Sequence, residues 1–202
     1  MEVLGRVIER FTAWFALGIL VVFTSCVGGG SKSSSGSGSE VVKEIPRVVA
    51  PAFDADSAFA FVAQQVAFGP RVPNTSEHEA CAAWLSSELE RHGAEVTVQE
   101  GRARAFDGTI LNMKNIVGTF HPESRDRILL FAHWDTRPFA DKDSVRQREP
   151  IDGANDGASG VGVLLEIARQ LGLNAADVGV DIVFFDAEAV SYTHLTLPTI
   201  SR

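Results

Sequence analysis

One histidine and four carboxylates lie where short apolar segments end or in a glycine-rich loop, and together they could hold a metal ion. These residues are His133, Asp135, Asp156, Asp186 and Glu188. Imidazole nitrogens and carboxylate oxygens are ligands of Zn²⁺ in catalytic sites. Because like charges repel at close range, a cation is the simplest way to hold such a cluster together. The alternative is a set of solvated loop carboxylates in which one aspartate caps a helix.

Two apolar segments and the stretch between them predict how these residues are brought together. Residues 128–131 and 178–185 are short and rich in Ile, Val and Phe, which is typical of buried parallel strands. Residues 158–170 predict a helix that is stopped by Gly172. The strand, helix and strand predict a βαβ unit with a right-handed crossover. Functional sites of such sheets lie beyond the carboxyl ends of the strands, where the five candidates fall.

The segments before this unit predict two more helices and two more strands. Residues 54–68 predict a helix capped by Asp54 or Asp56, and the stretch from Ser76 to Glu79 predicts a capping box that opens the next helix. The two further strands are predicted over residues 94–99 and 112–120. The domain is therefore expected to be a three-layer α/β fold, with a mixed sheet and helices on both faces.

Four residues of the helix that follows Ser76 could be mistaken for functional groups. Cys81 and Trp84 lie within the helix and are expected to be core residues. His78 and His92 lie near its two ends, where we expect solvated or capping histidines.

Several separate motifs, in the same order, make the chain resemble a known family. They are Phe-Gly-Pro-Arg-Val-Pro at residues 68–73, Ala-His-Trp-Asp-Thr-Arg-Pro at 132–138, the stretch 150–166, and Phe-Phe-Asp-Ala-Glu at 184–188. With these motifs the chain resembles the zinc-dependent M28 peptidases, and within them the glutaminyl-peptide cyclotransferases (glutaminyl cyclases), especially the bacterial lipoprotein forms. The resemblance covers roughly residues 53–188 and implies a three-layer α/β/α zinc-hydrolase fold.

The resemblance implies a role for each candidate residue. Asp156 matches a zinc ligand that bridges two ions in the peptidases and binds a single ion in the cyclases. His133 matches a ligand of the second zinc in the peptidases, whereas the equivalent histidine of the one-metal cyclases need not bind metal. One or two Zn²⁺ ions are therefore expected. Asp135 would orient His133, and Asp186 would support the loop. A hydrogen-bonded structural cluster is the alternative for His133, Asp135 and Asp186.

Glu188 matches the general acid and base of the family, which leaves two activities open. In a cyclase, Glu188 would move a proton from the α-amine of an N-terminal glutamine to the departing ammonia, which yields pyroglutamate. In an aminopeptidase, the same carboxylate would activate a zinc-bound water. The motifs favour the cyclase, with peptide or protein N-termini as substrates. A third possibility is an inactive, surface-tethered binding module.

The N-terminal composition predicts a targeting segment followed by a flexible tether. The chain has 202 residues and a formal net charge of −8 with no basic run, which argues against nucleic-acid binding. Residues 1–26 predict a signal peptide that ends in a lipobox-like Cys26, and residues 27–47 predict a flexible tether. A lipidated Cys26 implies anchoring to a membrane of the bacterial cell envelope, facing the periplasm or the surface. A plain cleaved signal or an uncleaved anchor is the alternative.

The resemblance ends abruptly after Glu188. Ala189 stands where the family has an acidic zinc ligand, and residues 190–202 resemble nothing in the family. We therefore expect residues 48–189 to be the N-terminal part of a catalytic domain that is incomplete at its C-terminus, followed by a non-native tail. His194 lies in that tail and is not expected to replace the late histidine ligand of the family. A chain that ends as written would lack the full ligand set and would be inactive.

Overall fold

A computed structural model describes residues 49–105 and 107–191 of the chain. The predicted signal peptide, Cys26 and the tether lie outside these residues, as does the tail from residue 192 onward. No helix within the two described ranges is long and apolar enough to span a membrane.

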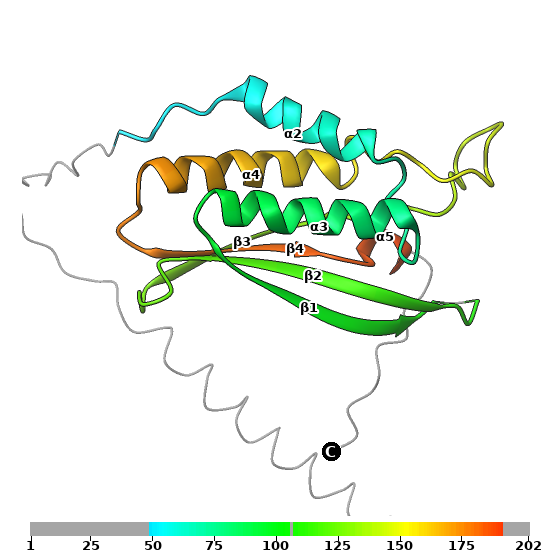
Figure 1. Ribbon diagram of the computed structural model, residues 1–202. Coiled ribbons are helices and arrows are strands. Elements are labelled where there is room, and N and C mark those ends of the chain that lie inside the picture. The colour runs from blue at the N-terminus through cyan, green and yellow to red at the C-terminus, as the bar shows by residue number, and fades with distance from the viewer. Residues whose placement is uncertain (1–48, 106, 192–202) are drawn as a thin grey trace, which may run out of the picture. The chain divides into compact units, whose positions relative to one another are not determined.

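The four strands form one mixed sheet in the order β1-β2-β4-β3 (Figure 1). They are β1 (Glu95–Arg104), β2 (Ile110–Phe120), β3 (Arg127–His133) and β4 (Gly179–Phe185). β3 and β4 pair in parallel, whereas β2 pairs antiparallel with β1 and with β4. The predicted mixed α/β class is confirmed, and each predicted strand is present. β1 extends beyond the predicted end at residue 99, because it pairs with β2 as far as Arg104.

Three helices cover one face of the sheet (Figure 1). They are α2 (Ala55–Ala67), α3 (Ser76–Arg91) and α4 (Ala158–Leu173). α4 packs on β3, α3 packs on β1 and β2, and α2 packs against α4. The core between helices and sheet includes the fully buried side chains of Leu85, Leu89, Ile116, Leu165 and Ile182. Burial of such side chains contributes about 1.5–3 kcal/mol each, which makes this layer the main source of stability.

The other face of the sheet carries no helix in the part of the chain that the structure describes (Figure 1). Leu129, Phe131 and Phe185 are 57%, 65% and 39% exposed. The rings of Phe131 and Phe185 pack edge to face, with their centroids 5.8 Å apart. The described residues thus form two layers of the predicted three-layer architecture.

Local capping agrees with the sequence at α2 and differs at α3. Asp54 caps α2, as predicted, by accepting hydrogen bonds from the backbone N–H groups of Asp56 and Ser57 at 3.0 and 3.1 Å. The predicted capping box at Ser76 is displaced by one residue. Thr75 is the N-cap of α3, and its hydroxyl oxygen accepts from the N–H of His78 at 3.3 Å.

The predicted stop of α4 at Gly172 is wrong, since the helix continues to Leu173. Gly172 has a packing role instead: a Cβ at this position would lie 2.4 Å from the carbonyl oxygen of His92. Glycine is required where two backbones approach this closely. Within α4, Glu166 is fully buried and joins this helix to the start of α2, because its carboxylate accepts the N–H of Asp54 at 3.1 Å.

Candidate active site

The parallel pairing of β3 and β4 brings the two loops that carry the site to the same end of the sheet. His133 pairs in register with Phe185, the last residue of β4. The N–H of Trp134 donates to the carbonyl oxygen of Phe185 at 3.0 Å, so the two chains stay together one residue beyond the strand. Asp135 and Asp186 therefore leave the sheet side by side.

Asp135 fastens these two loops to each other. Its carboxylate is completely buried and accepts the backbone N–H groups of Glu188 and Ala189, both at 3.1 Å. The same carboxylate lies 3.4 Å from Nδ1 of His133. Asp135 thus contacts the imidazole on one side and holds the backbone of Glu188 on the other. Its role in orienting His133 stays a prediction.

Asp156 reaches His133 from the loop that precedes α4. Oδ1 of Asp156 lies 3.0 Å from Nε2 of His133. Gly157 is the N-cap of α4 and has a φ of 104°, and a Cβ there would lie 3.1 Å from the carbonyl oxygen of Asp135. A glycine at this position lets the loop pass close to the end of β3, which brings the Asp156 carboxylate to the imidazole.

Arg71 supports the loop that carries Asp156. The sequence showed Arg71 only as part of the 68–73 motif and did not predict this supporting role. Its side chain is fully buried, and the guanidinium donates to the carbonyl oxygens of Asp152 and Gly153 at 2.5 and 3.1 Å. It also donates to the carbonyl oxygen of Trp134 at 3.4 Å. A buried guanidinium that satisfies several carbonyls fixes the distance between the Asp156 loop and the end of β3.

The charges around His133 favour its protonated form. The side-chain interaction with Asp135, together with the nearby carboxylates of Glu188 and Asp156, raises the pKa of His133 to about 9, whereas its partial burial acts in the opposite direction. Burial raises the pKa of Asp135, although its contact with His133 lowers it. Such a negative environment around one imidazole also suits a divalent cation.

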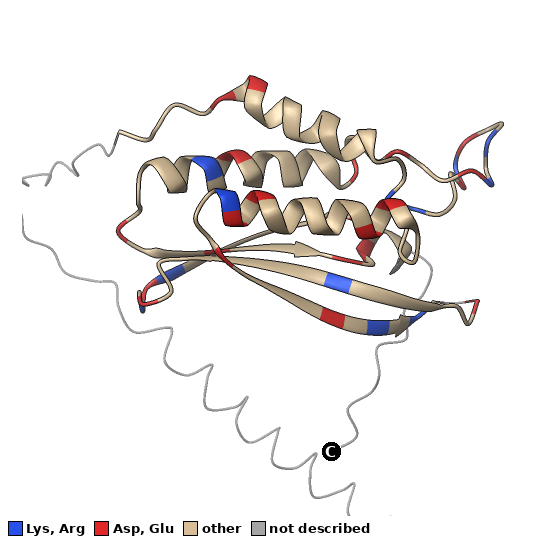
Figure 2. Cartoon of the chain, viewed as in Figure 1, with Lys and Arg blue, Asp and Glu red and all other residues tan. Residues whose placement is uncertain are grey.

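The site opens into a hollow of about 420 Å³ that is lined by His133, Asp156, Glu188, Arg137 and Lys142. The side chain of Glu188 is 50% exposed, and its Oε2 lies 3.7 Å from Nδ1 of His133. Figure 2 shows charges of both signs in the loop between β3 and α4, which borders this hollow. A charged molecule such as a peptide N-terminus could therefore reach Glu188 from solvent.

The donor types at this site fit zinc, but their number is incomplete. His133 and Asp156 offer one nitrogen and one oxygen donor within contact of each other. A catalytic zinc takes three protein ligands. In residues 49–105 and 107–191, no three His, Cys, Asp or Glu side chains converge on one metal position. Ala189, where the resemblance expects an acidic ligand, has its N–H bound to Asp135 and offers no side-chain donor.

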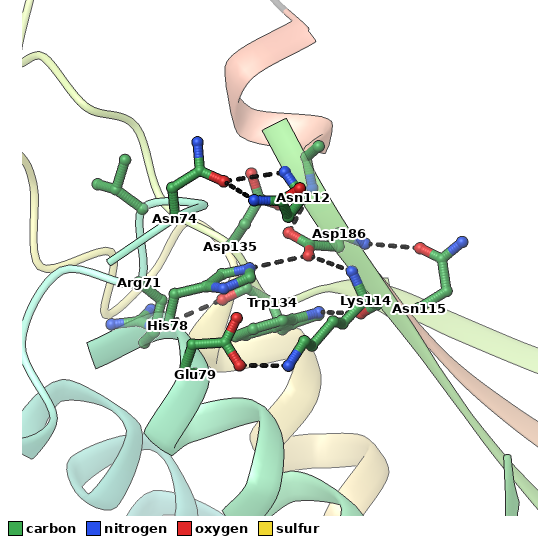
Figure 3. Close-up of polar contacts among 12 residues, drawn as sticks. Arg71, Asn74, His78, Glu79, Asn112, Lys114, Asn115, Trp134, Asp135 and Asp186 are labelled. Atoms are coloured by element: carbon green, nitrogen blue, oxygen red, sulfur yellow. Dashed lines mark hydrogen bonds and ion pairs between the residues drawn. The ribbon is translucent and has the colours of Figure 1, made fainter. Parts of the chain in front are cut away.

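Asp186 lies behind the hollow, away from the pair formed by His133 and Asp156. Its carboxylate accepts from the ring of His78 at 2.8 Å and from the N–H groups of Lys114 and Ala187 at 2.6 and 2.7 Å (Figure 3). These contacts tie Asp186 to α3, to β2 and to its own turn, and its supporting role stays a prediction. The prediction that His78 is a solvated or capping residue is wrong, because its side chain is completely buried.

The remaining helix residues are core residues. Cys81 is fully buried, and burial raises the pKa of its thiol to about 12, so it is no nucleophile. Trp84 packs against the core and contacts the rings of Phe61 and Phe68. His92 is buried rather than solvated, but it is the C-cap of α3, as the capping alternative predicted, and its backbone N–H donates to the carbonyl oxygen of Glu88 at 3.1 Å.

The comparisons with known proteins agree with this arrangement. Residues 115–192 match the model of peptidase family M28. The chain is 55% identical to the solved glutaminyl cyclase of Tannerella forsythia, with a TM-score of 0.68, over 75% of this chain and 52% of that chain. It is also 55% identical to a Zn-dependent exopeptidase from Parabacteroides distasonis, with a TM-score of 0.67, over 75% of this chain and 51% of that chain. The M28 match therefore covers β3, α4, β4 and the segments around the site, and two solved relatives share about half of the aligned residues.

The chain spans about half the length of the solved relatives that it matches. Among curated proteins, it is 36% identical over 75 residues to the uncharacterized protein YfbL of Escherichia coli, which is 37% of this chain and 22% of that protein. The resemblance inferred from the motifs is thereby confirmed at the level of the family. The individual roles of His133, Asp156 and Glu188 stay predictions.

Proposed function

We propose that this chain is part of the catalytic domain of a zinc-dependent glutaminyl-peptide cyclotransferase, which converts an N-terminal glutamine to pyroglutamate and releases ammonia. The observation that carries the proposal is the position of Glu188, whose half-exposed carboxylate lies in the same hollow as His133 and Asp156. The 55% identity to a glutaminyl cyclase supports the choice of reaction.

Glu188 would act as the general base and then as the general acid. Its carboxylate takes a proton from the α-amine of the substrate, the amine nitrogen forms a bond to the γ-carbonyl carbon, and the bond to the side-chain nitrogen breaks. Glu188 then delivers the proton to that nitrogen, which leaves as ammonia. Asp135 keeps Glu188 in place because it holds the backbone N–H groups of both Glu188 and Ala189.

Zinc would be held by Asp156 Oδ1 and His133 Nε2, which already face each other. When bound, the ion would polarise the γ-carbonyl of the glutamine. Asp135 would orient the imidazole through Nδ1, the usual arrangement for a histidine ligand with a carboxylate behind it. Metal analysis of the loaded protein gives the number of bound ions, one or two.

An M28 aminopeptidase is the second candidate, and its support is the equal identity to a Zn-dependent exopeptidase. An inactive, surface-tethered module is the third, because Ala189 supplies no ligand where the resemblance expects one. Two enzyme assays of the zinc-loaded full-length protein distinguish the three candidate functions. A cyclase releases ammonia from a glutamine-initiated peptide, an aminopeptidase releases p-nitroaniline from leucine p-nitroanilide, and an inactive module does neither.

Glu188→Gln is the variant that tests the proposed chemistry. It should lower kcat by about 10²- to 10⁴-fold, the usual contribution of a general acid and base. Glu149→Gln, which changes an exposed glutamate in the loop between β3 and α4, is the matched control and should leave kcat unchanged. Cyclisation at the wild-type rate in Glu188→Gln would exclude the assigned role.

We also propose that Cys26 is lipidated and anchors the protein to a membrane of the bacterial cell envelope. The support is the order of a basic region, an apolar stretch, Cys26 and a Gly/Ser-rich tether in the sequence. Expression in a bacterial host with labelled palmitate should label the protein, and Cys26→Ser should abolish the label. Labelling that persists in Cys26→Ser would contradict the proposal.

A further inference from the structure

A buried histidine and a buried aspartate form a pair directly behind the turn that precedes Glu188, the first residue of the short helix α5 (Glu188–Ser191). Nε2 of His78 lies 2.8 Å from Oδ2 of Asp186, and both side chains are fully buried (Figure 3). An ionised carboxylate can only accept hydrogen bonds, so the proton of the imidazole lies on Nε2. Nδ1 of His78 has no hydrogen-bond partner among the described residues. The contact to Asp186 is therefore the polar interaction that fixes the ring.

Packing holds the His78 ring in this orientation. The ring stacks on the indole of Trp134, with centroids 4.4 Å apart and planes inclined by 21°. The indole N–H in turn donates to the carbonyl oxygen of Lys114 at 3.1 Å (Figure 3). α3 is tied to β2 next to this point, where Glu79 forms an ion pair with the side chain of Lys114. His78 is thus a rigid donor on a helix that is itself attached to the sheet.

Asp186 uses the bond from His78 to shape the turn after β4. Its two oxygens accept the N–H of Lys114 at 2.6 Å and the N–H of Ala187 at 2.7 Å. Its own N–H donates to the side-chain oxygen of Asn115 at 3.0 Å. Ala187 is buried and has a φ of 60°, in the left-handed region that costs a residue other than glycine about 1–3 kcal/mol. A strained residue persists only when its surroundings hold it, and here the Asp186 carboxylate does so.

The turn at Ala187 determines where Glu188 points. Immediately after it, the N–H groups of Glu188 and Ala189 donate to Asp135. The short segment 187–189 is therefore held by one carboxylate on each side, Asp186 from its own chain and Asp135 from the end of β3. Without the donor of His78, Asp186 would keep a buried negative charge with fewer hydrogen bonds, which is costly.

We propose that His78 is a positioning residue for Glu188: through the buried contact with Asp186 it sets the left-handed turn at Ala187, which aims the Glu188 carboxylate into the hollow with His133 and Asp156. The part of this inference that concerns catalysis rests on the proposed function. The part that concerns the turn rests on the contacts alone and can be tested without any activity.

Amide hydrogen exchange of the full-length protein tests the turn. His78→Phe keeps a ring that can stack on Trp134 but removes the donor, and it should speed exchange of the amides of residues 187–189 about tenfold or more, whereas the amides in the middle of β4 stay protected. His78→Gln keeps a donor and should restore most of the protection. Cys81→Ala, one turn further along α3, is the control for a general loosening of that helix.

Asp186→Asn is a second variant that removes the charge of the acceptor in the same contact, and it keeps the test decisive if His78→Phe does not fold. It should speed exchange at the same three amides. The proposal is overturned if these amides keep wild-type protection in His78→Phe and Asp186→Asn, or if Cys81→Ala speeds their exchange equally.

Steady-state kinetics of the zinc-loaded protein tests the consequence for catalysis. His78→Phe should lower kcat by about 10- to 100-fold, the usual effect of removing a residue that orients an active-site group, with KM within about twofold of wild type. His78→Gln should recover most of kcat. Equal losses in His78→Phe and Cys81→Ala would overturn the positioning role. If the wild-type protein turns over no glutamine-initiated peptide, the proposed function fails, and the exchange result still decides the role of His78 in the turn.

Discussion

Asp135 accepts a hydrogen bond from the backbone N–H of Glu188 at 3.1 Å, although the two residues are 53 positions apart in the sequence. The contact exists because β3 and β4 are parallel neighbours whose ends lie side by side. One buried carboxylate thus joins the end of β3, which carries His133, to the start of the short helix α5 (Glu188–Ser191), which carries Glu188.

Asp135→Asn tests the importance of this hydrogen-bonded contact. An asparagine can accept one of the two N–H groups, but its amide nitrogen then faces the other donor, so we expect a loss of about 1–3 kcal/mol in the free energy of unfolding. The variant should also lower the pKa of His133 from about 9 toward its ordinary value of 6.5, because Asp135 is the largest cause of the shift. Urea unfolding and an NMR titration of metal-free protein measure the two effects. A His133 pKa that stays near 9 in Asp135→Asn would disprove this assignment.

The raised pKa of His133 also makes the stability of the metal-free protein dependent on pH. A group whose pKa is higher in the folded state stabilises the fold fully below its unfolded pKa, and this stabilisation is lost as the pH rises through the folded pKa. The contribution of His133 should therefore decline between pH 6.5 and about 9. Unfolding measured across this range should show the decline in the wild type and a smaller one in His133→Gln.

The buried carboxylate of Glu166 predicts the opposite dependence at acid pH. The Arg169 guanidinium, with help from Gln170 and the N–H of Asp54, lowers the pKa of Glu166 from 4.5 to about 2. Its stabilisation, roughly 3 kcal/mol from the size of this shift, is present above pH 4.5 and is lost as the pH falls toward 2. Glu166→Gln should remove most of it at pH 7 in urea unfolding. Glu90→Gln, at an exposed position of α3, is the control and should change the stability little.

Much of this fold could be predicted from the sequence because its elements have clear periods. The short runs of β-branched and aromatic residues identified β3 and β4, and the strand-end rule then placed His133, Asp135, Asp186 and Glu188 at the same edge. Gly172 was misread because a glycine near the end of a helix is usually its stop. Here it is needed for close packing against His92, a contact between distant residues.

The part of the site that the sequence did not reveal consists of buried polar residues. We expected His78 to be a solvated or capping histidine because it lies near a helix end. It shares a helix face, however, with Cys81, Leu85 and Leu89, all of which are buried. That spacing was the available signal. No such signal exists for the bonds of Arg71 to Asp152 and Gly153, because the acceptors are loop carbonyls that only the folded chain brings together.

Ala189→Glu tests whether the site lacks one zinc ligand. The resemblance to the M28 family expects an acidic zinc ligand at this position. Zinc affinity measured by calorimetry should rise about tenfold or more in Ala189→Glu, because a third protein ligand completes the set that a catalytic zinc requires. Ala189→Gln, which has a similar size and no charge, is the control and should change the affinity less. Equal affinities for both variants would mean that the side chain at 189 does not reach the metal.

The face of the sheet that no helix of the described residues covers predicts self-association. Phe131 and Phe185 form an aromatic pair on that face, and β3 is an edge strand of the described sheet. An exposed apolar patch on an edge strand promotes contact with other molecules. We expect Phe131→Glu to lower both the weight-average mass at high protein concentration and the fluorescence of the dye ANS. Phe59→Glu is the matched control, since Phe59 is 73% exposed but lies on α2, on the helical side of the sheet. If both variants reduce association to the same extent, the effect comes from added charge in general and the uncovered face of the sheet is not its cause.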